Sequence, residues 1–273
     1  MSWVTIARTE FETTKESRAV RWLLWLLAGA CVLAGYLFPE VTGGSITTRE
    51  FAGFSFLTES INYLLALIGV VLGYGAIVEE RTSGKLTLLL SLPYSRRDLV
   101  VGKVVGRSLV FATALVAALA VAGALVVYPF GSLSLGWYIA FVVVTVCYGV
   151  IFTGLAVSIS MLTSSKHVAT IGAFGSYGLF VAIWGTVESS LEYGLETIGM
   201  IEGGLPDALA FVFSLNPVRL YTRIVDGLIA GGSGTTAGSD AWYFSEWLAL
   251  VAFVAWLVVP LTLSYLWFST TDL

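Results

Sequence analysis

Six long apolar runs limit the fold of this chain more than any other feature of its sequence. An α-helix rises about 1.5 Å per residue, so about 20 apolar residues cross the roughly 30 Å hydrocarbon core of a bilayer. Inside lipid every backbone amide must be hydrogen-bonded locally, so each run is expected to be a helix. The predicted spans are Trp22–Phe38, Ile61–Val78, Leu109–Val127, Trp137–Met161, Val168–Val187 and Glu246–Phe268.

The composition is that of a membrane protein. Charged residues make up 12% of the 273 residues and hydrophobic residues 57%, with a mean hydropathy of +0.88. Soluble domains carry about 25% charged residues, so no sizeable water-soluble domain fits. We expect a single all-α polytopic domain over residues 1–273, located in the cell membrane. The net charge of −4 and the preference for Arg over Lys would fit a prokaryotic, halophilic source.

The basic residues predict the orientation of the spans. Cytoplasmic loops of membrane proteins carry an excess of Lys and Arg. The N-terminal arm, the 79–107 loop and the turn at 163–167 hold 11 of the 14 basic residues. Only Arg49, Arg219 and Arg223 remain for the other side. We therefore place the N-terminus and, after six spans, the C-terminus in the cytoplasm.

The N-terminal residues 1–20 have the pattern of an amphipathic helix. Trp3, Val4, Ala7 and Phe11 share one helical face, and charged residues flank it. Such a helix is expected to lie in the interface, on the cytoplasmic surface of the membrane.

The segment 188–245 is predicted to be extracytoplasmic and to contain a second amphipathic helix before the last span. From Asn216-Pro217 onward, Tyr221 and Val225 fall on an apolar face, whereas Arg223 falls on the polar side. We interpret 205–230 as a helical segment in the interface. A seventh span is the alternative, and it would put the C-terminus outside.

The sequence shows no pattern for catalysis, metal binding or nucleotide binding. No ionisable residue lies near the middle of a span, and the single histidine, His167, falls at a predicted turn. Neither a H-E-x-x-H zinc motif nor a G-x-x-x-x-G-K-[ST] phosphate loop occurs. We therefore expect no catalytic residue, no metal and no cofactor in this chain.

The stretch 79–107, between the second and third runs, is best suited to hold a soluble partner because it is polar and basic. A short charged segment ends at the helix breaker Gly84, and an apolar stretch follows up to Pro93. Ser95 and Asp98 have the spacing of a capping box, which predicts that the third helix starts there, before its membrane portion. Contact with anionic headgroups would also explain the basic charge. Because Glu80 and Arg81 lie outside the membrane, we expect their replacement by Ala to leave folding intact.

Closely spaced glycines in the second and fifth runs allow helices to approach each other. They are Gly69, Gly73, Gly172, Gly175 and Gly178. Packing within the chain and the seam of a dimer are both compatible with this spacing. We predict that the second and fifth spans supply the dimer seam.

Taken together, the features of the 79–107 loop resemble the permease subunits of ABC-2 type ATP-binding-cassette (ABC) transporters. That family has acidic and basic residues after the second span, then a small-residue–Gly turn, a Leu-rich stretch, Leu-Pro, Ser-Arg and Gly-Lys. The matching residues are Glu79, Glu80, Arg81, Ser83, Gly84, Leu88–Leu90, Leu92, Pro93, Ser95, Arg96, Gly102 and Lys103.

The resemblance extends along the chain. Residues 6–11 resemble the basic entry helix of the family, Asn216-Pro217 its extracytoplasmic Asn-Pro element, and Asp272-Leu273 its C-terminal end. Ser269-Thr270-Thr271 stand where basic residues are usual. Size and span number are most similar to the subgroup that includes the nitrous-oxide-reductase maturation permease.

The resemblance implies an exporter in which two permease copies, identical or closely related, pair with two ATP-binding subunits that hold ATP and Mg. The segment 79–92 would be the coupling helix. Its contacts with the ATPase would come from Glu79, Glu80, Arg81, Ser83, Gly84 and Lys85. The loop would be shaped by Pro93, Ser95, Arg96, Asp98, Gly102 and Lys103. The chain would be no enzyme itself, and its other partner would be the lipid bilayer, with no nucleic acid. An ATP-independent carrier or channel and a membrane scaffold are the alternative functions.

Overall fold

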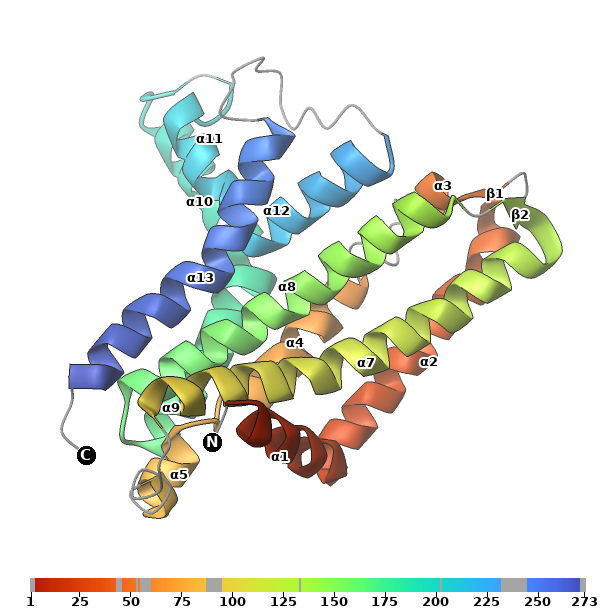
Figure 1. Cartoon of the computed structure of the whole chain (residues 1–273). Helices are drawn as coiled ribbons and strands as arrows, with labels where there is room; N and C mark the ends of the chain where they lie inside the picture. The colour runs from red at the N-terminus through yellow and green to blue at the C-terminus, as the bar shows by residue number, and fades with distance from the viewer. Residues whose placement is uncertain are drawn as a thin grey trace.

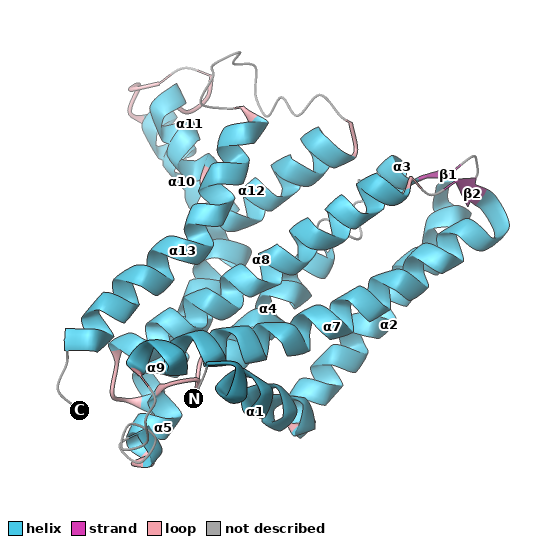
Figure 2. Cartoon of the chain, in the orientation of Figure 1, coloured by secondary structure: helices cyan, strands magenta, loops and turns pink. Residues whose placement is uncertain are grey.

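The computed structural model describes residues 3–42, 46–52, 54, 60–86, 95–132, 134–201, 203–231 and 245–270. These residues are almost entirely helical, as Figures 1 and 2 show, and the predicted all-α fold is confirmed. Two-residue strands, β1 (Ile46–Thr47) and β2 (Gly131–Ser132), pair in parallel between the ends of neighbouring helices.

Six helical stretches within the described residues are long and apolar enough to cross a membrane, which confirms the predicted number. The first, third, fourth and sixth are single helices. The second and fifth are each built from shorter pieces. In order the stretches are α2 (Arg18–Thr42), α4 (Ile61–Gly73) with α5 (Val78–Thr82), α7 (Arg96–Phe130), α8 (Leu135–Leu162), α9 (Lys166–Tyr177) with η2 (Gly178–Ile183) and α10 (Trp184–Thr197), and α13 (Glu246–Thr270).

The third helix begins well before its predicted apolar run, at the capping box expected from the sequence. The Asp98 backbone N–H donates to Ser95 Oγ at 3.0 Å, and the Ser95 N–H donates back to the Asp98 carboxylate at 3.3 Å. These two bonds satisfy donors that a helix start otherwise leaves free. The predicted cap is therefore confirmed, and α7 extends over 35 residues.

Helix α8 is central to the bundle and packs against α4, α7, α9 and α13. Its contact with α4 depends on two glycines. A Cβ at Gly69 would lie 2.6 Å from the Gly149 carbonyl oxygen, and one at Gly73 would lie 2.5 Å from that of Thr153. Gly69 and Gly73 thus pack inside the chain, and their assignment to a dimer seam was wrong because α8 already fills the space they leave.

The glycines of the fifth span differ among themselves. A Cβ at Gly172 would lie 2.9 Å from Ile159 of α8. A Cβ added at Gly175 or at Gly178 would have no described atom of another residue within 4 Å. Gly172 therefore belongs to packing within the chain. Gly175 and Gly178 face open space and stay available for a partner.

Helix α1 (Trp3–Glu16) packs along the start of α7. Ala7 is buried there, while Trp3 and Val4 of the predicted apolar face stay exposed. The close approach needs glycine, because a Cβ at Gly106 would lie 2.5 Å from the Ala7 carbonyl oxygen. The sequence thus correctly predicted a helix, but half of the expected membrane-facing surface packs on protein.

The segment before the last span forms short helices, of which α12 and η3 pack into the bundle. They are α11 (Asp207–Ser214), α12 (Pro217–Arg223) and η3 (Ile224–Ile229). Tyr221 and Val225 are buried as predicted, and the Tyr221 hydroxyl lies 3.0 Å from Thr145 Oγ1 of α8. Arg223 was expected on a polar face but is only 6% exposed. The segment 205–230 thus forms no seventh span; its α12 and η3 pack against α8 and α13, while Phe213 of α11 contacts Trp184 of α10.

Candidate functional site

The candidate site is the junction where α5 follows α4. The second span is interrupted at residues 74–77, and the backbone N–H groups of Ile77 and Val78 both donate to Ser160 Oγ of α8 at 3.0 Å. Arg107 of α7 donates to the Leu72 carbonyl at 2.5 Å. Side chains from two other helices thus satisfy backbone groups at the interruption, which fixes the position of α5.

The three charged residues of α5 each bind a different part of the bundle. Glu79 pairs with Lys166 at the start of α9 at 2.7 Å, and Glu80 pairs with Lys103 of α7 at 2.7 Å. Arg81 Nη1 donates to the Thr163 carbonyl, in the turn after α8, at 3.1 Å. This five-residue helix is therefore tied to three neighbouring segments at once.

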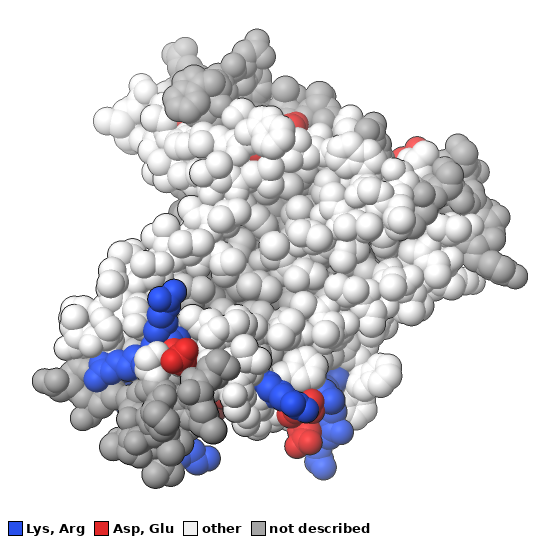
Figure 3. Space-filling model, in the orientation of Figure 1, with Lys and Arg blue, Asp and Glu red and all other residues white. Residues whose placement is uncertain are grey.

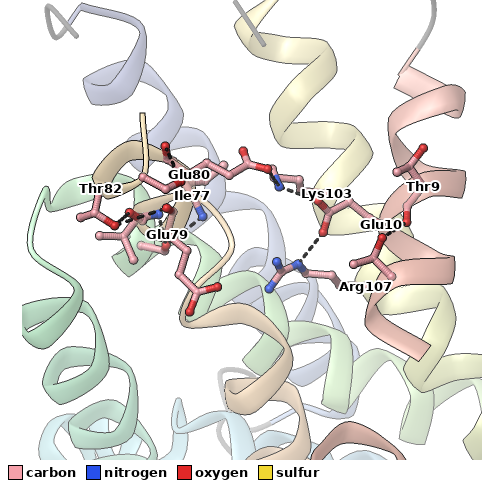
Figure 4. A network of polar contacts seen from close by, with 12 residues as sticks. Thr9, Glu10, Ile77, Glu79, Glu80, Thr82, Lys103 and Arg107 are labelled. Carbon is pink, nitrogen blue, oxygen red and sulfur yellow. Dashed lines mark hydrogen bonds and ion pairs between the residues drawn. The ribbon is translucent and has the colours of Figure 1, made fainter. Parts of the chain in front are cut away.

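Lys103 lies at the centre of a buried network of charges (Figure 4). Its side chain is only 2% exposed, and its ammonium group contacts both Glu80 at 2.7 Å and Glu10 of α1 at 2.5 Å. Arg107 Nε also donates to Glu10, at 2.9 Å. Two carboxylates and two cations thus pair with one another, as buried charges require, while Glu80 Oε2 has no hydrogen-bond partner among the described residues. The network connects α1, α5 and α7.

The charge state of Glu10 follows from this network. Burial by itself raises the pKa of the Glu10 carboxyl, but the charges and hydrogen bonds of Lys103 and Arg107 outweigh burial and leave the pKa below its ordinary value of 4.5. Glu10 is therefore ionised near neutral pH and holds α1 against α7 as a carboxylate.

The end of α13 joins the same junction. Arg96 donates to the carbonyls of Phe268 at 2.6 Å and Ser269 at 3.2 Å, which are among the last carbonyls of the helix. The guanidinium groups of Arg81 and Arg96 each lie 5.5 Å from the centre of the buried Phe268 ring. These are cation–π contacts, and they tie the last span to α5 and α7.

The tip of the junction is solvent-exposed. Thr82, Ser83, Gly84 and Lys85 are all exposed, and Gly84 ends the helix with a φ of +73°, a conformation that favours glycine. The rest of the predicted coupling segment, including Leu88–Leu90, Leu92 and Pro93, lies outside the described residues. Among the described residues of the segment, Glu80 and Arg81 are engaged within the chain, whereas residues 82–85 are exposed.

This engagement corrects one expectation from the sequence. Replacing Glu80 or Arg81 was expected to leave folding intact because both charges lie outside the apolar runs. The structure shows that Glu80 compensates a buried lysine and that Arg81 caps a turn. Among the predicted loop residues, Lys103 and Gly102 also act inside the chain, Gly102 by letting the Trp3 carbonyl of α1 approach.

Several residues of the junction were not identified from the sequence as its members. They are Glu10, Arg107, Ser160, Thr163, Lys166 and Phe268. One signal could have indicated Glu10, which is an acidic residue near the apolar face of an amphipathic helix. The others carry no local signal, since each meets its partner only through the packing of the spans.

The charged residues of the junction gather at one end of the molecule. In Figure 3, Lys and Arg side chains cluster where Figure 1 places α1 and α5, and the middle of this face is uncharged. The contacts above bring the N-terminal helix, the 79–107 loop, the turn at 163–165 and the end of α13 to this end. The described parts of these segments thus lie at the same end of the molecule, as the sequence predicted, and their cytoplasmic location stays a prediction.

Comparison with known proteins identifies the family. The model of the ABC-2 family transporter proteins matches residues 4–273. The chain belongs to this family. It is also 30% identical over 264 residues to "Probable ABC transporter permease protein NosY" of Pseudomonas aeruginosa, covering 94% of this chain and 92% of that protein. It is 29% identical over 259 residues to the protein of the same name from Stutzerimonas stutzeri, covering 90% and 91%.

These findings confirm the resemblance seen in the sequence, over nearly the whole chain. The protein is a multi-pass membrane protein of a transporter family, with six apolar spans in its described residues. The family also implies a membrane setting and a partner that binds ATP.

Proposed function

We propose that this chain is the permease subunit of an ATP-driven exporter, and that a separate ATPase subunit docks at the tip of α5, residues 82–85. Both relatives carry the name of an ABC transporter permease. The ATPase subunit would bind ATP and Mg, so hydrolysis would occur outside this chain. Export, rather than import, is taken from the resemblance of the 79–107 loop to export permeases.

One observation carries the proposal, namely the set of contacts made by α5. A displacement of its exposed tip would act at once on α9 through Glu79, on α7 and α1 through Glu80, and on the α8–α9 turn through Arg81. A partner can shift a two-state protein only by contacts that differ between the states. Contacts at a helix tied to three spans would supply such a difference.

A second permease copy is part of the proposal. Only 11% of the most apolar stretch of the fifth span is buried within the chain, whereas 72% of the corresponding stretch of the second span is buried. Gly175 and Gly178 lie on this poorly covered helix with open space before them. A second copy packed on the fifth span would bury this face and enclose a path between the two bundles.

The proposal also assigns the charged end of the molecule to the cytoplasm, because cytoplasmic loops are rich in Lys and Arg. Docking of an ATPase requires this orientation, since ATP is available there. The two alternative functions, an ATP-independent carrier or channel and a membrane scaffold, predict that activity does not depend on an ATPase.

Co-purification tests the docking site. The ATPase subunit encoded with this chain should bind the purified permease, and Lys85→Glu should weaken that binding about tenfold. Lys15→Glu is the matched control, because Lys15 is also exposed at this end but lies on α1, where it contacts Glu12 and the Phe11 ring of the same helix. Equal binding by wild type and Lys85→Glu would rule out the tip of α5 as the contact. Transport by the permease alone in liposomes would contradict the proposed function as a whole.

A further inference from the structure

A groove with apolar walls runs between the start of α7 and the end of α13. Its volume is about 570 Å³, within the range of roughly 300–1,000 Å³ that ligand sites occupy. Four valines of α7 and two leucines of α13 form most of its walls, namely Val100, Val101, Val104, Val105, Leu261 and Leu266.

The polar groups of the groove are few, and a cation lies at one end. Arg97 lines the groove in the first turn of α7, next to Arg96, which binds the carbonyls at the end of α13. The Thr262 hydroxyl is used within its own helix, because it donates to the Val258 carbonyl at 2.7 Å. Neither Arg97 nor the hydroxyl of Tyr265 has a hydrogen-bond partner among the described residues. The groove thus combines apolar walls with hydrogen-bond donors that have no partner among the described residues.

We propose that this groove binds one anionic phospholipid from the leaflet at the α5 end of the molecule. An acyl chain lies along the valines, and the headgroup phosphate accepts hydrogen bonds from Arg97. A guanidinium group matches phosphate geometry and keeps its charge at all physiological pH values. The lining residues that the structure describes include no Asp or Glu, so none of them would receive the ammonium group of a zwitterionic lipid. A net negative headgroup is therefore favoured.

Lipid binding to the purified full-length chain in detergent tests this proposal. By native mass spectrometry, wild type should retain one phosphatidylglycerol with about five- to tenfold preference over phosphatidylcholine, the size expected for one interfacial cation. Arg97→Gln should abolish the preference, and Arg97→Lys should keep part of it. Val101→Trp fills the groove and should lower the binding of both lipids.

Two controls separate a specific site from general attraction. Arg21→Gln removes an exposed arginine at the start of α2, in a cluster with Trp22 and Trp25, and should leave the preference unchanged. Thermal unfolding without added lipid should be the same for Arg97→Gln and wild type, since Arg97 forms no hydrogen bond or ion pair with another described residue.

Three results would overturn the proposal. Equal loss of preference in Arg97→Gln and Arg21→Gln would mean that surface charge alone attracts the lipid. Displacement of phosphatidylglycerol by an equal concentration of glycerol phosphate would mean that the site recognises free phosphate. Efficient crosslinking of two copies through a cysteine at Val101 would mean that a second chain covers the groove.

Discussion

At the scale of single residues, Lys103 explains most of the junction. A buried ammonium group is costly unless it is paired and hydrogen-bonded. Lys103 meets this condition only while α1 supplies Glu10 and α5 supplies Glu80. Movement of either helix would leave a charge without its partner, so Lys103 makes the positions of α1 and α5 depend on each other.

Adjacent glutamates of α5 should therefore respond differently to the same substitution. Glu80→Gln removes the charge that faces the buried Lys103 and should lower the free energy of unfolding by about 1.5–3 kcal/mol. Glu79→Gln is the control, because its ion pair with Lys166 is largely exposed and worth under about 1 kcal/mol. Lys103→Met leaves two carboxylates facing each other and should cost about 3–5 kcal/mol. Denaturation of the purified protein in detergent measures all three, and equal effects at Glu79 and Glu80 would contradict the network.

The lowered pKa of Glu10 predicts the direction of a pH effect. A carboxyl with a lowered pKa in the folded state contributes stability that is fully present above its unfolded value, near 4.5, and is lost as the pH falls through the folded value. Wild type should therefore lose stability below about pH 4.5. Glu10→Gln should be less stable than wild type at pH 7, and the difference should narrow in acid. A constant difference from pH 7 to pH 3 would show that Glu10 does not act through its charge.

At the scale of elements, the sequence predicted what depends on local spacing. The start of α7 was predictable because Ser95 and Asp98 are three residues apart and cap the same helix turn. The number of spans followed from the length of the apolar runs. The pairing of Glu10 with Lys103 joins residues 93 positions apart, and only the packing of α1 against Gly102 and Gly106 brings them together.

The glycines show the same limit, because spacing indicates close packing but not the partner helix. Gly73→Ala should lower the free energy of unfolding of the single chain by about 1–3 kcal/mol, since its Cβ would lie 2.5 Å from the Thr153 carbonyl oxygen of α8. Gly175→Ala should leave this stability unchanged, because open space surrounds that position. Unfolding of the two variants under monomeric conditions provides the test. If Gly175→Ala destabilised the single chain and Gly73→Ala did not, Gly175 rather than Gly73 would pack within the chain.

At the scale of the whole molecule, the end that carries the junction should lie in the cytoplasm. Single cysteines at Ser83 and Thr163, which lie at that end, should resist a membrane-impermeant reagent added to intact cells. Cysteines at Thr47 and Thr197, beyond the first and fifth spans, should react. Labelling after membrane disruption controls for accessibility, and the opposite pattern in intact cells would invert the proposed orientation.

The poorly covered fifth span should form the contact between two copies of the permease. Leu179 and Ile183 are 39% and 48% exposed on this helix, so cysteines there should crosslink between chains in the membrane. Val70 is fully buried between helices of the same chain, so a cysteine there should give no intermolecular product.

Gly175→Trp should weaken both dimer formation and ATPase-dependent transport while insertion stays normal, because a large side chain would hold the two fifth spans apart. Crosslinks from exposed positions of α2 or α13 in place of the fifth span would move the interface. A monomer in mild detergent that still couples fully to the ATPase would remove the need for a second copy.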